Sequence, residues 1–316
     1  MLYIHSDKID TLAGEWYTLL AAFLKARNYK RKMIRAISFS KLSIKDKAIA
    51  KGLIECYYIH LKEYALADEQ ELLFRHSLYQ QTILGKHKSR YKKIHKKLAT
   101  IFYNLYTEFT KYKPEKLDYP IAYHFFYALN IRTCPYCNRN YTFTIYDKIG
   151  KKTHPEYDHF YDKASNPLLA VSFFNLIPSC HVCNHVKHND SIRINPYFHG
   201  FKGKFKVSDD GIFRGFQTES KAEELDYKTF GLDQLYQLHD DYVQELTEKA
   251  RIYRGPMMEA LSSSFQTPDY SPKDVFNFIW GKNLDTANHV NRPLSKLTRD
   301  ILEELDIPVD DIDNNV

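Results

Sequence analysis

Long apolar runs, internal repeats and low-complexity tracts are absent from this sequence of 316 residues. It contains no eighteen consecutive apolar residues, and a membrane-spanning helix needs about that many. The first ten residues are charged and lead into no apolar core like that of a cleavable signal peptide. We therefore expect a soluble, cytoplasmic protein that does not contact a membrane.

Cysteine is scarce, since the chain holds only five. Four of them form two Cys-x-x-Cys pairs, Cys134 with Cys137 and Cys180 with Cys183, while Cys56 stands alone. A disulfide framework is unusual in a long intracellular chain, whereas thiols paired at this spacing are typical of metal sites. We expect Cys56 to be a small buried apolar residue.

Acidic residues are sparse in the first part of the chain and dominate the last. The net charge of +6 divides into +11 over residues 1–130, +3 over 131–200 and −8 over 201–316. A basic body of this kind attracts polyanions, above all nucleic acid. A lysine-rich surface that meets only solvent explains the charge equally well.

The first 120 residues are predicted to be helical. Apolar residues recur at helical spacing within residues 16–24 and again within residues 91–109. Pro114 and Pro120 then interrupt the pattern and indicate a boundary. The expected division is a basic helical domain (1–120), a central domain (121–200) and an acidic C-terminal region (201–316).

The later sections mix short strands with helices. We expect a strand over residues 141–147, a turn, and a returning strand through 154–158, followed by a hairpin over 203–216. The C-terminal region ends in an acidic tail that we expect to be frayed. Its predicted helices cover residues 232–253, 271–281 with Ser271 as N-cap, and 293–305.

The two thiol pairs are separated by 42 residues. Each Cys-x-x-Cys can present two thiolates to one tetrahedral ion, and two such turns make the four-sulfur site typical of structural zinc. A thiol-redox protein needs one such pair in a βαβ setting, so two matched pairs argue against it. The sequence predicts one structural Zn²⁺ held by Cys134, Cys137, Cys180 and Cys183, with a working insert between the pairs.

Polar residues in a fixed order fill that insert. Asp158-His159 ends a predicted strand, Asn175 follows in Phe-Phe-Asn-Leu, and Asn184 comes directly after the second thiol pair. In order, CPYC, DH, NL and CHVCNHVK resemble the zinc-knuckle branch of the HNH nuclease family, across residues 134–188. The resemblance implies an α+β protein, mostly helical, with an embedded ββα-metal finger, which is a β-hairpin followed by a helix around one metal.

The resemblance also assigns a role to each residue. His159 is implied as the general base that takes a proton from water, a task suited to a neutral imidazole. Asp158 and Asn184 are implied as oxygen ligands of a catalytic Mg²⁺ or Mn²⁺. Asn175 is implied as the residue that ties down the loop and so orients the base.

Two positions depart from the family pattern. Asp162 stands where many relatives have proline, and Asn184 stands where many have histidine. His185 or His188 is an alternative ligand for the catalytic metal. We expect His181, inside the second thiol pair, to be a surface residue rather than a zinc ligand.

Positive side chains near the motif and on the predicted helix around residues 86–97 are candidates for phosphate contacts. Each of them alone is more often just a solvated charge, and the helix is also a candidate dock for an acidic partner. The candidates are Lys163, Lys187, Arg193, Lys92, Lys93, Lys96 and Lys97.

The leading hypothesis is a metal-dependent HNH endonuclease that hydrolyses phosphodiester bonds in DNA. The first alternative is a zinc-stabilised nucleic-acid-binding module without catalysis, although the intact Asp158, His159 and Asn184 argue against it. RNA is left open as a substrate. The motif wording is also similar to that of HNH proteins of bacterial anti-phage systems of the Septu and retron-associated kind. That similarity implies a defence role, an ATPase partner, and flanks that dock a partner or inhibit the site.

Overall fold

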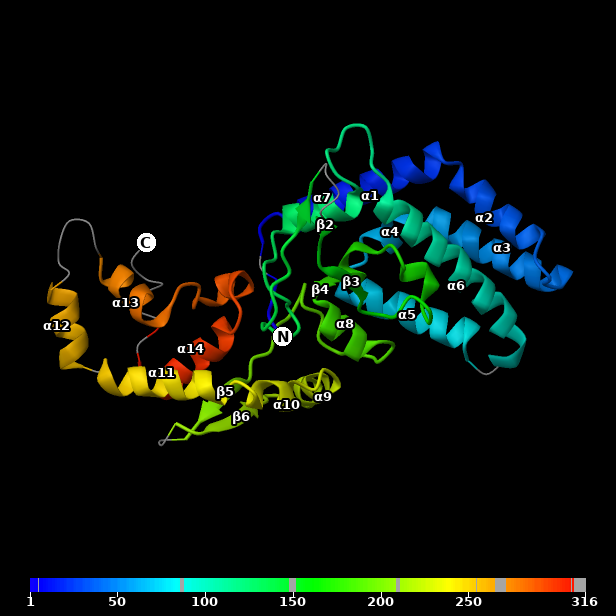
Figure 1. The fold of residues 1–316 in the computed structure, drawn as a ribbon. Helices are drawn as coiled ribbons and strands as arrows, with labels where there is room; N and C mark the ends of the chain where they lie inside the picture. The colour runs from blue at the N-terminus through cyan, green and yellow to red at the C-terminus, as the bar shows by residue number, and fades with distance from the viewer. Residues whose placement is uncertain are drawn as a thin grey trace.

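The computed structural model describes residues 1–4, 6–85, 88–147, 152–208, 211–253, 255–264, 271–307 and 309. Within these residues helices predominate and the strands form three antiparallel pairs, so the predicted α+β class is confirmed. Figure 1 shows helices on one side, a central section with short strands, and further helices on the other side. None of the described helices combines the length and the apolar character needed to cross a membrane.

The first helices form what we call the helical lobe, residues 9–129. Both apolar series of the predicted helices face its interior, and only Tyr91 among their members is half-buried rather than buried. The periodicity therefore predicted these core positions correctly. The helices of the lobe are α1 (Ile9–Ala26), α2 (Tyr29–Ser38), α3 (Ile44–Ile59), α4 (Leu61–Ala65), α5 (Glu69–Ile83), α6 (Lys88–Lys111) and α7 (Ile121–Leu129).

Trp16 joins the helical lobe to the central section. Its ring meets Phe109 and Phe125 edge-on, with centroids 4.9 and 5.0 Å apart. Its Nε1 donates a hydrogen bond to the carbonyl oxygen of Val171 at 2.9 Å. The apolar core is therefore continuous across the boundary expected near residue 120.

Cys56 differs from its prediction. The residue lies on the exposed side of α3, whereas Ile54 and Tyr57 take the buried positions of that turn. A free cysteine is usually buried, but the helical period leaves this position facing outward.

The central section carries two strand pairs. β1 (Ile145–Tyr146) pairs with β2 (Lys152–Thr153), and β3 (Glu156–His159) pairs with β4 (Leu176–Ser179). The predicted strand over 141–147 is thus two residues long, and the segment before Asp158 does not return onto it. β3 pairs with β4 because all of β4 and most of β3 are buried, whereas β1 and β2 are largely exposed. Residues 148–151 of the predicted turn lie outside the described residues.

A long loop joins β3 to β4, and a helix that follows β4 packs against β3. Two short 3₁₀ turns, η1 (Pro167–Leu169) and η2 (Phe173–Asn175), lie within this loop. α8 (His181–Lys187) follows β4 and packs against β3. The order in the chain is therefore strand, strand, helix, with His159 at the end of the first strand.

The C-terminal lobe, residues 204–307, begins with the predicted hairpin of β5 (Lys204–Val207) and β6 (Phe213–Gln217). The helix predicted over 232–253 is divided in two, because Asp240 and Asp241 favour a new helix start there. Ser271 is the predicted N-cap and forms a capping box with Asp274. The helices are α9 (Lys221–Thr229), α10 (Leu232–Gln237), α11 (Asp240–Ile252), α12 (Pro256–Ser264), α13 (Pro272–Trp280), η3 (Thr286–Asn291) and α14 (Ser295–Glu304).

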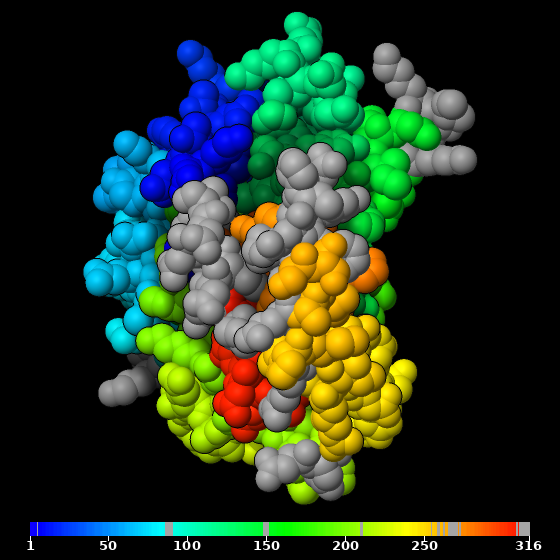
Figure 2. Space-filling model, turned by 90° about the vertical axis from the view of Figure 1, so that its left-hand side faces the viewer, coloured from blue at the N-terminus to red at the C-terminus, as the bar shows by residue number. Residues whose placement is uncertain are grey.

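Helices α11 and α12 form much of the near surface when the molecule is viewed from the side of the C-terminal lobe (Figure 2). The N-terminal helices are visible behind and above them in that view. The hairpin-turn residues 209–210 and the acidic tail 310–316 lie outside the described residues.

Candidate functional site

The four paired cysteines come together as one cluster. Their sulfur atoms all lie within 4.8 Å of one another, and all four residues are buried. The first pair comes from the turn that follows residue 133, and the second from the start of α8. Among the described residues this is the only group of three or more histidine, cysteine or acidic side chains close enough together to hold a metal ion.

Nitrogen donors surround the sulfur atoms. The backbone N–H of Arg139 donates to Cys137 Sγ at 3.4 Å, and the side-chain amide of Asn140 donates to Cys180 Sγ at 3.3 Å. The N–H of Cys183 also donates to Cys180 Sγ, at 3.4 Å. Such donors stabilise thiolates, so the cluster can hold one metal ion such as zinc.

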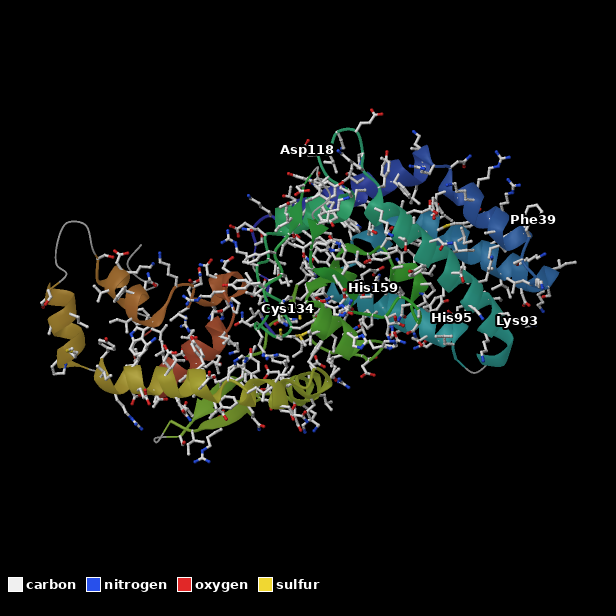
Figure 3. All side chains as sticks on the ribbon, in the orientation of Figure 1. Phe39, Lys93, His95, Asp118, Cys134 and His159 are labelled. Carbon is white, nitrogen blue, oxygen red and sulfur yellow. The ribbon has the colours of Figure 1, made fainter. Side chains whose placement is uncertain are left out.

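A polar hollow of about 280 Å³ opens beside the cysteine cluster, at the junction of β3 and α8. Figure 3 places His159 in the middle of the molecule, with Cys134 nearby on the side of the C-terminal lobe. Most of the predicted motif residues therefore meet in one place. The lining residues are Glu156, Asp158, His159, Asp162, Lys163, His181, Asn184, His185, His188 and Asn189.

His159 is held through its Nε2, and Lys163 faces its other ring nitrogen. Its Nε2–H donates to the carbonyl oxygen of Ala170 at 3.0 Å, which assigns the proton to Nε2 and leaves the lone pair on Nδ1. The ring of Tyr106 meets the imidazole edge-on, with centroids 4.8 Å apart. Burial lowers the pKa of His159 well below its usual value, and the positive charge of Lys163 lowers it further. The imidazole is therefore neutral at neutral pH, as a general base must be.

Asp158 is buried and fixed from two sides. The hydroxyl of Tyr136 donates to Oδ2 at 2.6 Å, and the ammonium of Lys187 donates to Oδ1 at 3.2 Å. Burial raises the pKa of Asp158, and Lys187 opposes that rise. Each carboxylate oxygen retains a second lone pair, so the group can still coordinate a cation.

Lys187 does not lie where a phosphate contact would require it. Its side chain is 0% exposed, and its ammonium is bonded to Asp158 and to the carbonyl oxygen of His159, at 2.9 Å for the latter. A buried ammonium needs such partners, because an unpaired charge in the interior is costly. Lys187 therefore supports Asp158 and is corrected from a surface contact to an interior one.

Asn175 lies behind the site rather than in it. Its Oδ1 accepts from the N–H of Tyr161 at 2.7 Å, while its Nδ2 donates to the carbonyl oxygens of Tyr161 and Leu169, at 3.1 and 3.0 Å. These bonds tie together the two ends of the loop whose Ala170 carbonyl orients His159. That Asn175 orients the base in this way stays a prediction.

Asn184 projects from α8 toward an acidic partner that the sequence did not single out. Its Nδ2 donates to Glu156 Oε2 at 2.6 Å. The other oxygen of Glu156 bonds to Nδ1 of His181 at 2.8 Å, so His181 is an exposed residue outside the cysteine cluster. These two bonds oppose the effect of partial burial and lower the pKa of Glu156. Because its NH₂ group faces Glu156, the Asn184 amide oxygen points elsewhere and can act as a ligand.

The departure at Asp162 has a local explanation. Its Oδ2 accepts from the N–H and the hydroxyl of Ser165, at 2.9 and 2.7 Å, and so caps the turn that follows β3. Lys163 then projects over the ring of Tyr106, with its ammonium 3.5 Å from His159 Nδ1. Lys163 is the candidate phosphate contact that lies in the site.

The other basic candidates lie outside the hollow. Arg193 donates to Asp226 of α9 at 3.1 Å. On α6 the side chains of Lys92, Lys93 and Lys96 are exposed and that of Lys97 is half-buried. Figure 3 shows Lys93 and His95 near one end of this helix. Lys86 and the side chains of residues 88 and 90 lie outside the described residues.

Three contributors to the site were missed at the sequence level: Tyr136, Glu156 and Tyr106. Glu156 carried a usable signal, because residues two apart on a strand point to the same side, and Asp158 is its partner at that spacing. Tyr136 and Tyr106 gave none, since their contacts depend on how the cysteine turn and α6 pack against β3.

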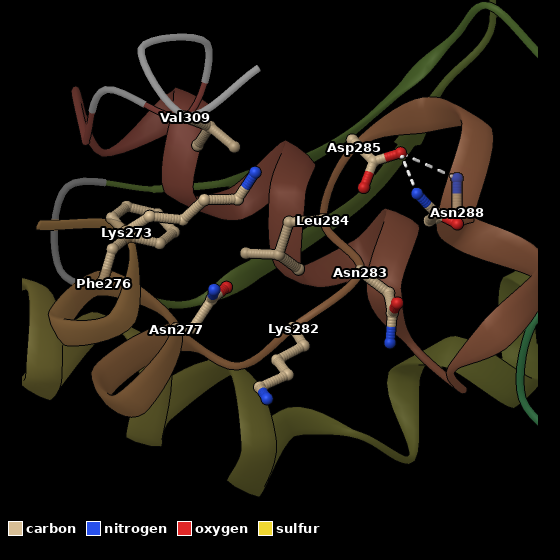
Figure 4. A pocket seen from close by; sticks show the side chains of 9 residues that line it. All are labelled: Lys273, Phe276, Asn277, Lys282, Asn283, Leu284, Asp285, Asn288 and Val309. Atoms are coloured by element: carbon tan, nitrogen blue, oxygen red, sulfur yellow. Dashed lines mark hydrogen bonds between the residues drawn. The ribbon is translucent and has the colours of Figure 1, made fainter. Parts of the chain in front are cut away.

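A second hollow, of about 250 Å³, lies in the C-terminal lobe (Figure 4). Its Asp285 accepts hydrogen bonds from the N–H and the side chain of Asn288, at 2.9 and 2.8 Å, and so serves as the cap of η3. That carboxylate is engaged in holding the local fold. The hollow beside β3 is therefore the better candidate for chemistry.

No protein-family model, curated protein or solved structure matches this chain.

Proposed function

We propose that this protein is a metal-dependent HNH endonuclease that hydrolyses phosphodiester bonds in DNA. The observation that carries the proposal is the geometry of His159, whose Nδ1 carries the lone pair and, with Lys163 3.5 Å away, lies in the hollow that Asp158 and Asn184 also line. The strand–strand–helix order of β3, β4 and α8 supports a ββα-metal finger. A binding module without catalysis has no need of a buried neutral imidazole next to a carboxylate.

The residues present fit a hard divalent cation. Asp158 offers a carboxylate oxygen and Asn184 an amide oxygen, which are the ligand types that Mg²⁺ and Mn²⁺ prefer. Such an ion, when bound, would supply positive charge to the phosphate and to the leaving oxygen. His185 and His188, which also line the hollow, are the alternative ligands.

His159 performs the proton transfer. Its Nδ1 takes a proton from a water molecule as the water oxygen bonds to phosphorus and the bond from phosphorus to the leaving oxygen breaks. The leaving oxygen then takes a proton from solvent. Lys163, close to Nδ1, keeps the imidazole unprotonated and can contact the phosphate.

The cysteine cluster has a structural task in this account. A zinc ion bound there would link the turn of Cys134 and Cys137 to the start of α8, and so fix Asn184 relative to β3. The basic face of α6 would add contacts to the nucleic-acid backbone that do not depend on sequence. A defence role with an ATPase partner belongs to the same proposal, and RNA is the alternative substrate.

The proposal is tested by incubating the purified protein with supercoiled plasmid and with RNA, in Mg²⁺, Mn²⁺ or EDTA. Nicked or linear plasmid in either metal, and none in EDTA, is the expected result. Cleavage of RNA but not of plasmid would make RNA, rather than DNA, the substrate. Binding of both polymers without cleavage in any metal would favour the non-catalytic module.

A further inference from the structure

Tyr136 connects the cysteine cluster to the proposed active site. It lies between Cys134 and Cys137 in the first thiol turn, and its side chain is fully buried. Its hydroxyl donates to Asp158 Oδ2 at 2.6 Å. A bond this short to a carboxylate is a strong, charge-assisted one and restricts how the carboxylate can turn.

The same side chain touches the C-terminal lobe. The ring of Tyr136 stacks on Phe230, which ends α9, with centroids 4.6 Å apart and planes inclined by 29°. Phe230 is itself buried, at 1% exposure. From α10, the hydroxyl of Tyr236 donates to the carbonyl oxygen of Cys137 at 2.5 Å. The turn is therefore held by the C-terminal lobe as well as by Asp158.

Asn138 fastens the end of the turn to the same lobe. Its Nδ2 donates to the carbonyl oxygens of His289 and Arg292, at 3.0 and 2.9 Å. Its Oδ1 accepts from the hydroxyl of Ser295 at 3.2 Å and from the N–H of Lys296 at 3.1 Å. Asn138 has a φ of 47°, a left-handed conformation that asparagine tolerates better than most residues. These bonds join positions that are far apart in the sequence.

We propose that Tyr136 is a positioning residue that holds Asp158 in its metal-binding orientation, and that the C-terminal lobe acts on the active site through Phe230 and Tyr136. The inference rests on the proposed function, because it takes Asp158 as a ligand of the catalytic metal. The C-terminal lobe would then do more than dock a partner, because displacement of α9 would loosen the carboxylate of Asp158. The inference also makes the zinc turn part of the active site rather than only a support for α8.

The matched variant is Tyr136→Phe, which removes one oxygen and keeps the ring that stacks on Phe230. Phe230→Leu disturbs the stack and keeps the hydroxyl. Phe278→Leu is the control, since Phe278 belongs to the same lobe and is 85% exposed. Zinc content measured for each protein shows whether the cysteine cluster remains intact.

The experiment titrates each zinc-loaded protein with Mn²⁺, follows binding by electron paramagnetic resonance, and measures plasmid cleavage in parallel. Tyr136→Phe is expected to weaken Mn²⁺ binding about tenfold and to slow cleavage by about tenfold to a hundredfold, with zinc retained. Phe230→Leu should weaken Mn²⁺ binding by a smaller factor, and Phe278→Leu should leave it unchanged.

Unchanged Mn²⁺ affinity and cleavage in both Tyr136→Phe and Phe230→Leu would overturn the inference. If Tyr136→Phe weakens Mn²⁺ binding but even the wild-type protein cleaves nothing, the positioning role stands and the endonuclease proposal fails. The two failures are therefore distinguishable.

Discussion

Glu156 shows how one side chain can set the orientation of another. Its bond to Asn184 Nδ2 turns the amide oxygen away from the carboxylate, and that oxygen is the implied metal ligand. We expect Glu156→Ala to raise the Mg²⁺ concentration needed for half-maximal cleavage by about tenfold. Glu156→Gln keeps an oxygen that can accept the same bond and should lie close to the wild type. Equal metal requirements in all three proteins would contradict the role.

The protonation of His159 predicts the acid limb of the pH profile. Burial and Lys163 lower its pKa well below the usual value, and the base works in its neutral form. The cleavage rate should therefore not fall as the pH drops from about 7 to 6, where an ordinary histidine would become protonated. Single-turnover rates over that range, with saturating metal, measure this. A fall centred near pH 6.5 would show that the base is another group or that His159 is more open to solvent.

Residue types were predicted better than their surroundings. Asp158, His159 and Asn184 line one hollow, as the family resemblance implied that they would lie together. The position of Lys187 could not be predicted from the sequence, because a lysine three residues after Asn184 looks like a surface charge. Only the structure shows that its side chain lies in the interior. The prediction that Cys56 is buried was wrong for the reverse reason. It relied on the usual burial of cysteine and not on the position of the residue on the helix.

At the scale of elements, the two thiol turns make the clearest prediction. Their four sulfur atoms lie within 4.8 Å of one another, so Cys180→Ser should remove the bound metal, about one ion per chain. Because binding energy at such a site is largely folding energy, α8 and the turn of Cys134 should lose their order. Elemental analysis and limited proteolysis report these two effects. Cys56→Ser is the matched control and should change neither, so full metal content in Cys180→Ser would contradict the assignment.

The lysines of α6, three exposed and one half-buried, predict a salt effect. Changing Lys92, Lys93, Lys96 and Lys97 to Gln should weaken binding to every nucleic-acid sequence alike. The slope of log affinity against log salt should shrink by about one unit for each phosphate that the variant no longer neutralises. Cleavage of saturated substrate should survive, because these residues do not line the hollow. An unchanged slope would point to a solvated face or to a dock for an acidic partner.

Elements with strong periodicity were predicted more accurately than short ones. The series in α1 and α6 gave the buried positions, and Ser271 gave the start of α13. The predicted pairing of the strands in the central section was wrong. Each strand is only two to four residues long, and burial rather than closeness in the sequence determines which strands pair. The long-range bonds of Tyr136 and Asn138 have no local sequence signal at all.

For the whole molecule, His289 offers a test of how the C-terminal lobe is attached. It is 5% exposed, its Nε2–H donates to the carbonyl oxygen of Leu284 at 2.9 Å, and burial lowers its pKa to about 4. Below pH 6.5 the unfolded chain takes up a proton that the folded chain refuses, so the free energy of unfolding falls as the pH drops toward 4.

The expected loss from this residue is about 1.6 kcal/mol between pH 6.5 and 5. Denaturant unfolding of the wild type and of His289→Gln at several pH values measures it, because the stability difference between the two proteins should shrink as the pH falls. His199→Gln, at an exposed histidine paired with Glu69, is the control. A difference that stays constant with pH would mean that His289 is not buried in a neutral form.

The central claim is that His159 activates water in a metal-dependent nuclease. The most direct test compares plasmid cleavage by the wild type and by His159→Ala, both loaded with zinc and supplied with Mg²⁺ or Mn²⁺. The account predicts a loss of about 10² to 10⁴ in rate for His159→Ala, with zinc content and nucleic-acid binding nearly unchanged. Cleavage by His159→Ala at the wild-type rate would contradict it.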